Sequence, residues 1–289
     1  MARITPTHRL ESVKILPPNG ANREDLYGSI TAQAVSRTEV QAPLRNRSFC
    51  MAVTATRTRD MGRPTSWSGA IDALAAGRFE GDDGSQRRLF AISGGNVDPS
   101  SYSNYPTANE TDSIHDPAQA WNALTVGGFT ELVDLSRAGL SGHSPLAPLG
   151  GLSPHSTTAG SWERNKWPSK PDVVFEAGNR ARGPTGDVIA HDSLRLLSTS
   201  NTPTIHKPLT VFDGTSAATA LASNLIGRLH AAYPNAWPET IRALVVHAAE
   251  WTPAMRQQLL NPGEDETSLL PFVGWGVPSQ QKAIECGRN

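Results

Sequence analysis

The stretch DGTSAA at residues 213–218 joins a glycine-containing turn directly to an apolar helical pattern over residues 216–233 (SAATALASNLIGRLHAAY). The apolar positions form a wide surface of small residues, which predicts a helix buried against its neighbours. The turn therefore places the Ser216 hydroxyl at a helix N-terminus, where unpaired backbone N–H groups and the helix dipole favour negative charge. Ser216 fits two roles: a helix cap, or a nucleophile whose own N–H helps to hold the oxyanion formed by attack on a carbonyl.

Upstream of this turn, apolar strand patterns alternate with helical ones. We expect strands over residues 10–16, 48–54, 88–93, 120–128 and 171–178, and helices over residues 26–40, 66–76 and 238–251. The second helix has Ser66 or Ser68 as its expected N-cap. Strand–helix alternation predicts a parallel sheet with right-handed crossovers. Long loops, the first of them exposed, are expected near residues 97–118 and 137–170.

The composition argues against several classes of function. The 289 residues carry 26 Lys plus Arg against 27 Asp plus Glu, so no broad positive field attracts nucleic acid or an anionic membrane surface. No apolar run approaches the roughly 18–20 residues of a membrane-spanning helix, and the first residues lack a secretory signal, which leaves the location unknown with the cytoplasm as the default. Cys50 and Cys286 form neither a disulfide framework nor a metal-ligand pattern, so we expect no metal and no cofactor.

A second motif, Ser93-Gly94-Gly95-Asn96, follows an apolar strand. Ligands of open parallel sheets bind at the carboxyl ends of the strands. Glycines there let the backbone approach a substrate closely, and the Asn96 amide can donate a hydrogen bond. The alternative is a plain glycine turn in which Asn96 tolerates a left-handed conformation.

The order of these pieces resembles that of the subtilisin-like serine proteases, the subtilases, over residues 10–284. GTSAA at residues 214–218 matches the family's Gly-Thr-Ser-x-Ala motif, and SGGN at residues 93–96 resembles its Ala-Gly-Asn. Four further segments are similar to family segments in the same order: NALTVGG at 122–128, LSPHS at 152–156, KPDVVFEAGN at 170–179 and GWGVP at 274–278. Two positions depart from the pattern: Glu176-Ala177 stands for the family's Ala-Pro, and Thr219-Ala220 stands where a proline is common.

The resemblance implies a three-layer αβα fold with a mostly parallel sheet, formed as one peptidase domain over residues 1–289. It implies serine endopeptidase action through an acyl-enzyme, with Ser216 as nucleophile and Asn96 as oxyanion-hole donor. The polypeptide substrate is expected to add as an extended strand beside Ala52, Val53 and Thr54 and the backbone of Gly94 and Gly95. Calcium sites are common in the family, and the sequence offers no clear ligand cluster for one.

The sequence departs from the family in its catalytic base. The family's Asp-Ser/Thr-Gly and His-Gly-Thr motifs both precede the strand matched by residues 10–16, before which this chain has nine residues. None of the eight histidines, His8 included, is followed by glycine, and His115-Asp116 and His191-Asp192 lie after Asn96, where we expect solvated loop residues. We therefore expect an N-terminally incomplete domain that is nearly inactive alone, its Asp and His supplied by a missing N-terminal segment. A non-catalytic pseudoprotease that binds extended peptides is the alternative.

Two other hydrolase patterns fit less well. The Gly-x-Ser-x-Gly elbow of α/β-hydrolases fails because position 218 is Ala218. Ser279-x-x-Lys282 matches a short β-lactamase-type motif, but it stands near the C-terminus without the companion motifs.

Overall fold

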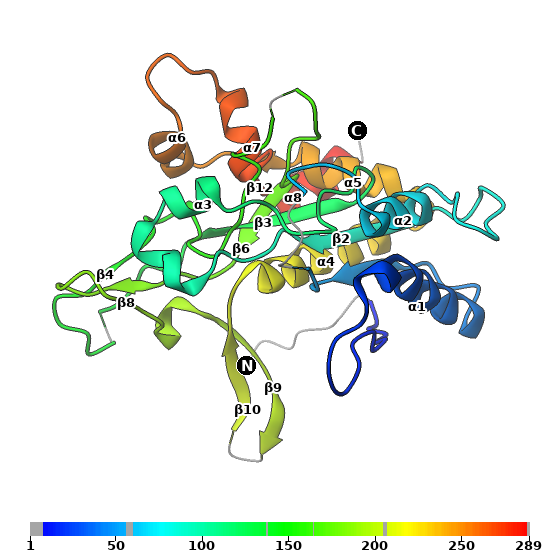
Figure 1. Cartoon of the computed structure of the whole chain (residues 1–289), viewed down its shortest axis with the longest axis horizontal. Coiled ribbons are helices and arrows are strands. Elements are labelled where there is room, and N and C mark those ends of the chain that lie inside the picture. The colour runs from blue at the N-terminus through cyan, green and yellow to red at the C-terminus, as the bar shows by residue number, and fades with distance from the viewer. Residues whose placement is uncertain (1–7, 56–59, 137, 164, 205–206, 288–289) are drawn as a thin grey trace.

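The computed structural model describes residues 8–55, 60–136, 138–163, 165–204 and 207–287. At its centre, a five-stranded sheet lies between two layers of helices (Figure 1). The parallel strands are, in spatial order, β1 (Ser48–Met51), β2 (Leu89–Ser93), β3 (Leu124–Thr130) and β6 (Val173–Glu176). The short β5 (Gly151–Leu152) pairs antiparallel with β3. The expected αβα fold with a mostly parallel sheet is confirmed.

The first helical layer consists of α1 (Tyr27–Gln41) and α2 (Ser66–Ala75), which pack against each other and on one face of the sheet. Its core joins helix residues to inward-facing residues of β2; the buried members include Trp67, Ile71, Leu74, Phe90 and Ile92. Fully burying one such side chain contributes roughly 1.5–3 kcal/mol. The layer therefore fixes β2, and with it the strand end that leads into Asn96.

The second helical layer consists of α4 (Thr215–Ala232), α5 (Pro238–His247) and α8 (Gln280–Cys286). α4 crosses the opposite face of the sheet and contacts β1, β2, β3 and β6. Its buried residues join those of β3 and α5 in one core, which includes Leu124, Val126, Ile226, Leu229 and Ile241. The predicted buried helix is thus confirmed, although Ala220 and Leu221 are exposed.

The remaining elements are short, except for one hairpin. Strands β9 (Leu196–Thr204) and β10 (Lys207–Phe212) form an antiparallel hairpin that extends away from the sheet and leads directly into the turn before α4 (Figure 1). The other elements are η1 (Glu24–Leu26), η2 (Pro99–Asn104), α3 (Thr107–Thr111), β4 (Ser144–Pro145), β7 (Ala181–Arg182), β8 (Val188–Ile189), η3 (Asp192–Leu194), β11 (Ala249–Glu250), α6 (Pro253–Leu259), η4 (Glu266–Leu269), α7 (Leu270–Val273) and β12 (Val277–Pro278).

Residues 10–16 do not form the expected strand. The segment is irregular, Leu10 is 93% exposed, and Glu11 is bound by the guanidinium groups of Arg45 and Arg47. An extended segment without a neighbouring strand leaves its backbone N–H and C=O groups to water, so an alternating pattern alone does not fix a strand. In the described part of the chain, the outer edge of β1 likewise pairs with no strand.

The N-cap expected for the second helix is also wrong. Thr65 caps α2, because its Oγ1 accepts from the Ser68 backbone N–H while the Ser68 hydroxyl oxygen accepts from the Thr65 N–H. This reciprocal pair is a capping box, with Ser68 in the position where Glu or Gln is usual. Thr65 Oγ1 also donates to Asp116 Oδ1 at 2.6 Å, which ties the start of α2 to the loop before β3.

The loop expected near residues 97–118 is not uniformly exposed. It contains η2 and α3, and Tyr102 and Asn109 within it are buried. The Asn109 amide nitrogen donates to the backbone oxygens of residues 153, 154 and 156, so the polar loop folds onto a second loop instead of into solvent. The polar side chains of this loop form hydrogen bonds inside the protein. Composition alone does not distinguish such side chains from ones that are hydrated at the surface.

Candidate active site

The turn before α4 favours glycine on two counts. Gly214 has φ +89°, in the left-handed region, and a Cβ there would lie 2.9 Å from Asn96 Oδ1. Its N–H donates to Ala177 O at 2.7 Å, which ties the turn to the end of β6. α4 begins at Thr215, so Ser216 lies in the first turn of an 18-residue helix.

The side chain of Asn96 is held in one orientation by Thr215. Asn96 Oδ1 accepts from the Thr215 backbone N–H at 2.9 Å. Because a backbone N–H can only donate, the carboxamide atom that faces it is the oxygen. The Asn96 amide nitrogen therefore turns away from Thr215, and the residue is exposed to solvent. A fixed amide donor beside the helix start that carries a serine is suited to stabilising an oxyanion.

Thr215 connects the two sequence motifs from the inside. It is fully buried, and its hydroxyl oxygen lies 2.7 Å from Ser93 Oγ, 3.0 Å from Gly95 O and 3.1 Å from Asn96 Oδ1. No role was predicted for Ser93 or Thr215 from the sequence. Both residues stand inside the two glycine-containing motifs, and this position was the available signal. The motifs were used only to identify Ser216 and Asn96.

Ser216 lies beside the segment that follows β1. Its Oγ is 3.4 Å from Ala52 O, longer than the usual O–H···O distance, and the residue is half-buried. The structure thus brings Ser216 together with Ala52, the first of the three residues predicted to bind substrate. β1 ends at Met51, earlier than the strand expected over 48–54, so Ala52, Val53 and Thr54 lie beyond the sheet edge.

The segment 114–116 joins the two predicted substrate-binding segments. His115 N–H donates to Gly94 O at 2.9 Å, and Ala55 N–H donates to Asp116 O at 2.8 Å. His115 Nδ1 lies 3.2 Å from Thr54 Oγ1. Gly95 has φ +105°, and a Cβ there would lie 2.4 Å from His115 Cγ, so the ring occupies the space beside that glycine.

The expectation that His115 and Asp116 are solvated loop residues is wrong. They are 2% and 6% exposed, because the loop that carries them is hydrogen-bonded to Gly94 and Ala55, in the segments that follow β2 and β1. Burial raises the pKa of the Asp116 carboxyl, against the hydrogen bonds that it accepts from Thr65 and Gln119. The pair is part of the frame of the site. His191, the other rejected candidate, faces Ser193 on the surface.

Ser216 lacks an imidazole partner within the described ranges. Its hydroxyl is hydrogen-bonded there to Ala52 O and to no histidine. His8, the histidine nearest in sequence to the family's histidine motif, lies against α4 at Gly227, three helical turns from Ser216. The described part of the chain therefore brings Ser216 and Asn96 to the start of α4 without a histidine hydrogen-bonded to the serine.

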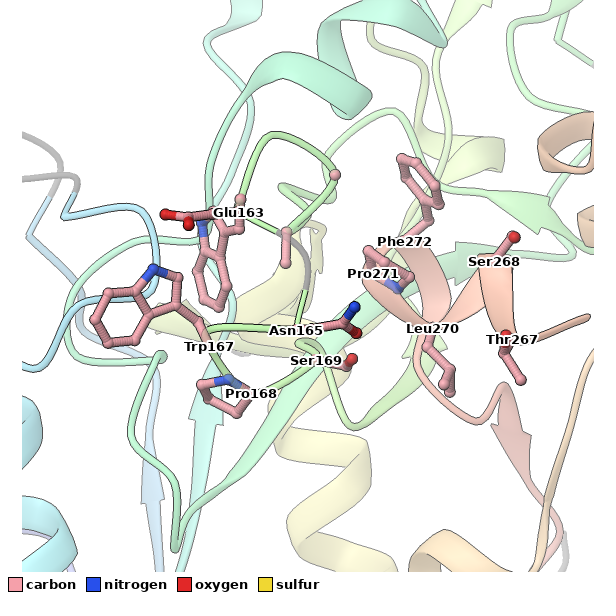
Figure 2. Close-up of a pocket in the computed structure, with 13 residues that line it drawn as sticks. Glu163, Asn165, Trp167, Pro168, Ser169, Thr267, Ser268, Leu270, Pro271 and Phe272 are labelled. Carbon is pink, nitrogen blue, oxygen red and sulfur yellow. The ribbon is translucent and has the colours of Figure 1, made fainter.

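Two hollows of the surface lie away from Ser216. One, of about 270 Å³, is lined by Trp162, Trp167 and Phe272 together with polar residues such as Asn165 and Ser169 (Figure 2). The other, of about 830 Å³, is lined by arginines and acids at the opposite ends of the strands, including Arg45, Arg47, Arg87, Glu39 and Asp82. Neither is lined by Ser216, Asn96 or the predicted substrate-binding residues.

Among the residues that the structure describes, no group of three or more His, Cys, Asp or Glu side chains could hold a metal ion. The helices in this part of the chain are all too short or too polar to span a bilayer.

An αβα fold with a serine at the N-terminus of a buried helix and an oriented amide beside it is the arrangement expected of a serine hydrolase. Residues 3–276 match the family model of the subtilase family, Peptidase S8, and the chain therefore belongs to the subtilases, serine proteases that hydrolyse peptide bonds. No curated protein matches the sequence.

Solved proteases share the fold at low sequence identity. A lanthipeptide protease is 12% identical, with 95% of this chain and 69% of that chain covered and a TM-score of 0.52. The S41 psychrophilic protease is 14% identical, with 91% and 66% covered and a TM-score of 0.52. Sphericase is 12% identical, with 91% and 66% covered and a TM-score of 0.51. This chain thus spans about two thirds of the length of these proteases.

Proposed function

We propose that this chain supplies the nucleophile and the oxyanion hole of a serine endopeptidase that acts through an acyl-enzyme. The observation that carries the proposal is the hydrogen bond from Thr215 N–H to Asn96 Oδ1, at the start of the helix that bears Ser216. It orients an amide donor before any substrate binds, and such preorganised donors are commonly a large source of transition-state stabilisation.

In the proposed reaction, Ser216 Oγ attacks the carbonyl carbon of a peptide bond while a base accepts the hydroxyl proton. The carbonyl oxygen becomes an oxyanion, which accepts hydrogen bonds from the Ser216 N–H and from Asn96 Nδ2. The C–N bond then breaks, the amine leaves with the proton, and the acyl group remains as an ester on Ser216. Water attacks this ester with the help of the same base and releases the carboxylic acid and the free serine.

The proposed substrate is an extended polypeptide. It adds as a strand beside Ala52, Val53 and Thr54 and the backbone of Gly94 and Gly95, a mode in which main-chain hydrogen bonds give affinity. Two contacts support this placement: Ser216 Oγ lies near Ala52 O, and segment 114–116 holds both substrate-binding segments in one frame. The frame keeps them fixed relative to the nucleophile.

The base and the acid that orients it come, in this proposal, from a polypeptide segment outside the described residues. Three features support a completing segment: Ser216 has no imidazole partner in the described part, the outer edge of β1 is unpaired there, and the matching proteases are longer.

A pseudoprotease that binds extended peptides without cutting them is the second candidate function. In the described part of the chain Ser216 has no imidazole partner, and this observation favours the pseudoprotease as much as it favours an incomplete protease. Strand addition beside Ala52 and Gly94 requires no base. The two functions differ in one property: only the protease gains peptide hydrolysis when the completing segment is present.

The test is to express the chain with and without the residues encoded in frame upstream of Met1 and to assay cleavage of denatured casein. The proposal expects hydrolysis by the extended protein, none by the extended Ser216→Ala variant, and almost none by the chain alone. Tight peptide binding without hydrolysis in the extended protein would support the pseudoprotease and contradict the endopeptidase.

A further inference from the structure

A half-buried charged cluster lies directly behind the serine turn. Asp213 comes immediately before Gly214, and its Oδ2 accepts from Arg180 Nη1 at 2.8 Å and from Arg195 Nε at 2.9 Å. Burial alone raises the pKa of the Asp213 carboxyl, but the neighbouring positive groups outweigh it and hold the pKa below its ordinary value. Asp213 is therefore an anion at neutral pH, fixed by two cations that belong to other segments.

His155 reaches from this cluster to the strand end that carries Asn96. Its Nε2 lies 3.8 Å from Asp213 Oδ2, and its side chain is 3% exposed. Its backbone oxygen accepts from Val97 N–H at 2.9 Å, and the next residue, Ser156, forms a β-bridge with Asn96. One residue thus touches the turn of the nucleophile through its side chain and the segment of the oxyanion donor through its backbone.

The protonation of His155 is set by its surroundings. Burial, followed by the positive charges of Arg180 and Arg195, lowers the pKa of His155 to about 4, so the ring is neutral at pH 7. Tyr102 Oη lies 2.8 Å from Nδ1. The Asp213 carboxylate beside Nε2 favours the tautomer with its proton on Nε2, and Tyr102 then donates its hydroxyl proton to Nδ1.

Tyr102 completes the cluster, which we call the brace: Tyr102, His155, Arg180, Arg195 and Asp213. The Arg180 guanidinium lies over the Tyr102 ring at 5.4 Å from its centroid, and the Tyr102 and His155 rings meet edge to face at 5.4 Å. The five residues come from five separate places in the sequence, so the cluster forms only when the folded chain brings these places together. The reaction described above uses none of these five side chains.

We propose that Asp213 and His155 are positioning residues, through which the brace sets the serine turn and the Asn96 segment in the spacing that the oxyanion hole requires. The inference rests on the proposed function of Ser216 and Asn96. The Thr215 N–H to Asn96 Oδ1 bond spans these two segments and reports their spacing. Gly214 N–H to Ala177 O anchors the turn to β6, but it makes no contact with the Asn96 segment.

Amide hydrogen exchange of the whole chain tests the proposal without any need for catalysis. The Thr215 amide reports the spacing, and the Val174 amide, which donates to Gly276 O in the core, reports global opening. Asp213→Asn removes the charge that holds two arginines. His155→Ala removes the side chain that joins Asp213 to the Asn96 segment. Each is expected to lower protection of the Thr215 amide at least tenfold, with less than a twofold change at Val174.

Two further variants serve as controls. His155→Gln can still accept from Tyr102 and donate toward Asp213, so it should keep Thr215 protection within about threefold of wild type. Asp265→Asn changes a surface carboxylate that accepts from Thr267 N–H, and it should leave both amides unchanged. If Asp213→Asn fails to fold, the comparison of His155→Ala with His155→Gln carries the test.

Two results would overturn the proposal: Thr215 protection that stays within twofold of wild type in Asp213→Asn and His155→Ala, or equal losses at Thr215 and Val174, which mark a merely structural role. In the extended protein, both variants should also lower kcat about tenfold with KM unchanged. Intact Thr215 protection in an extended protein without peptidase activity would contradict the proposed function alone, so the two failures are distinguishable.

Discussion

The two sides of Ser216 are built differently. The closed side consists of Thr215, Asn96 and the brace, where buried polar atoms find partners inside the chain. The open side comprises the outer edge of β1, which pairs with no strand in the described part of the chain, and the exposed apolar side chains of Phe212 and Leu221. The closed side is organised by this chain alone, whereas the open side is a surface that a further polypeptide can cover.

The largest expected difference between the sides is in stability and concerns one helix. Ile226→Ala in α4 removes a fully buried side chain and should lower the free energy of unfolding by about 2–5 kcal/mol. Leu221→Ala, on the exposed flank of the same helix, should cost less than about 1 kcal/mol, since it loses little burial. Urea unfolding of both variants measures the difference. Equal losses of unfolding free energy in the two variants would mean that the Leu221 side chain is buried, which would contradict an open side.

The next effect concerns catalysis on the closed side. Asn96→Ala removes the proposed oxyanion donor, so kcat of the extended protein should fall about 10²–10³-fold with little change in KM. Asn46→Ala, which removes a surface amide that donates to Pro234 O, is the matched control and should leave kcat unchanged. A rise in KM with unchanged kcat would assign Asn96 to substrate binding.

A smaller effect concerns the brace and how the free energy of unfolding changes when the pH is lowered. His155 has a pKa of about 4 in the folded chain, below its unfolded value, so the unfolded chain binds more protons between these values. The contribution of the neutral His155 to the free energy of unfolding is therefore present at neutral pH. It is lost as the pH falls from about 6.5 to 4, by up to about 3 kcal/mol. His155→Gln should flatten this part of the curve of unfolding free energy against pH. An unchanged slope would contradict a neutral buried His155.

The smallest expected effect isolates the clash behind the serine turn. Gly214 and Gly186 have nearly the same positive φ, but a Cβ meets Asn96 at Gly214 and open space at Gly186. Both alanine variants carry the backbone strain of about 1–3 kcal/mol, and Gly214→Ala should exceed Gly186→Ala by about a further 1 kcal/mol. Thermal unfolding measures the two. Equal values would mean that Asn96 moves aside freely.

The sequence predicted the parts of the molecule that repeat a local pattern. β2, β6, α2, α4 and α5 were predicted within a few residues, because each pairs a hydrophobic period with a clear start or stop. Ser216 and Asn96 were proposed as site residues because glycine marks the backbone beside them. The structure brings both to the start of α4, where Thr215 connects them.

The remainder depended on tertiary contacts that no local pattern encodes. Residues 10–16 have the alternation of a strand, yet a strand also needs a neighbour, and none pairs with this segment in the described part. His155 and Asp213 lie 58 residues apart in sequence, and only the fold sets them 3.8 Å from each other. His115 was read as solvated because loop polarity does not show which loops fold inward.

In the described part of the chain, Thr215 orients the Asn96 amide beside the helix start that carries Ser216, and no histidine is hydrogen-bonded to that serine. We therefore propose that the chain alone holds an organised oxyanion hole without a working base. The most direct measurement is labelling of the isolated chain with a fluorophosphonate serine-hydrolase probe, compared with its Ser216→Ala variant. We expect labelling that hardly exceeds that of the variant, since a serine without its base loses most of the catalytic factor. Robust labelling of Ser216 in the isolated chain would contradict it.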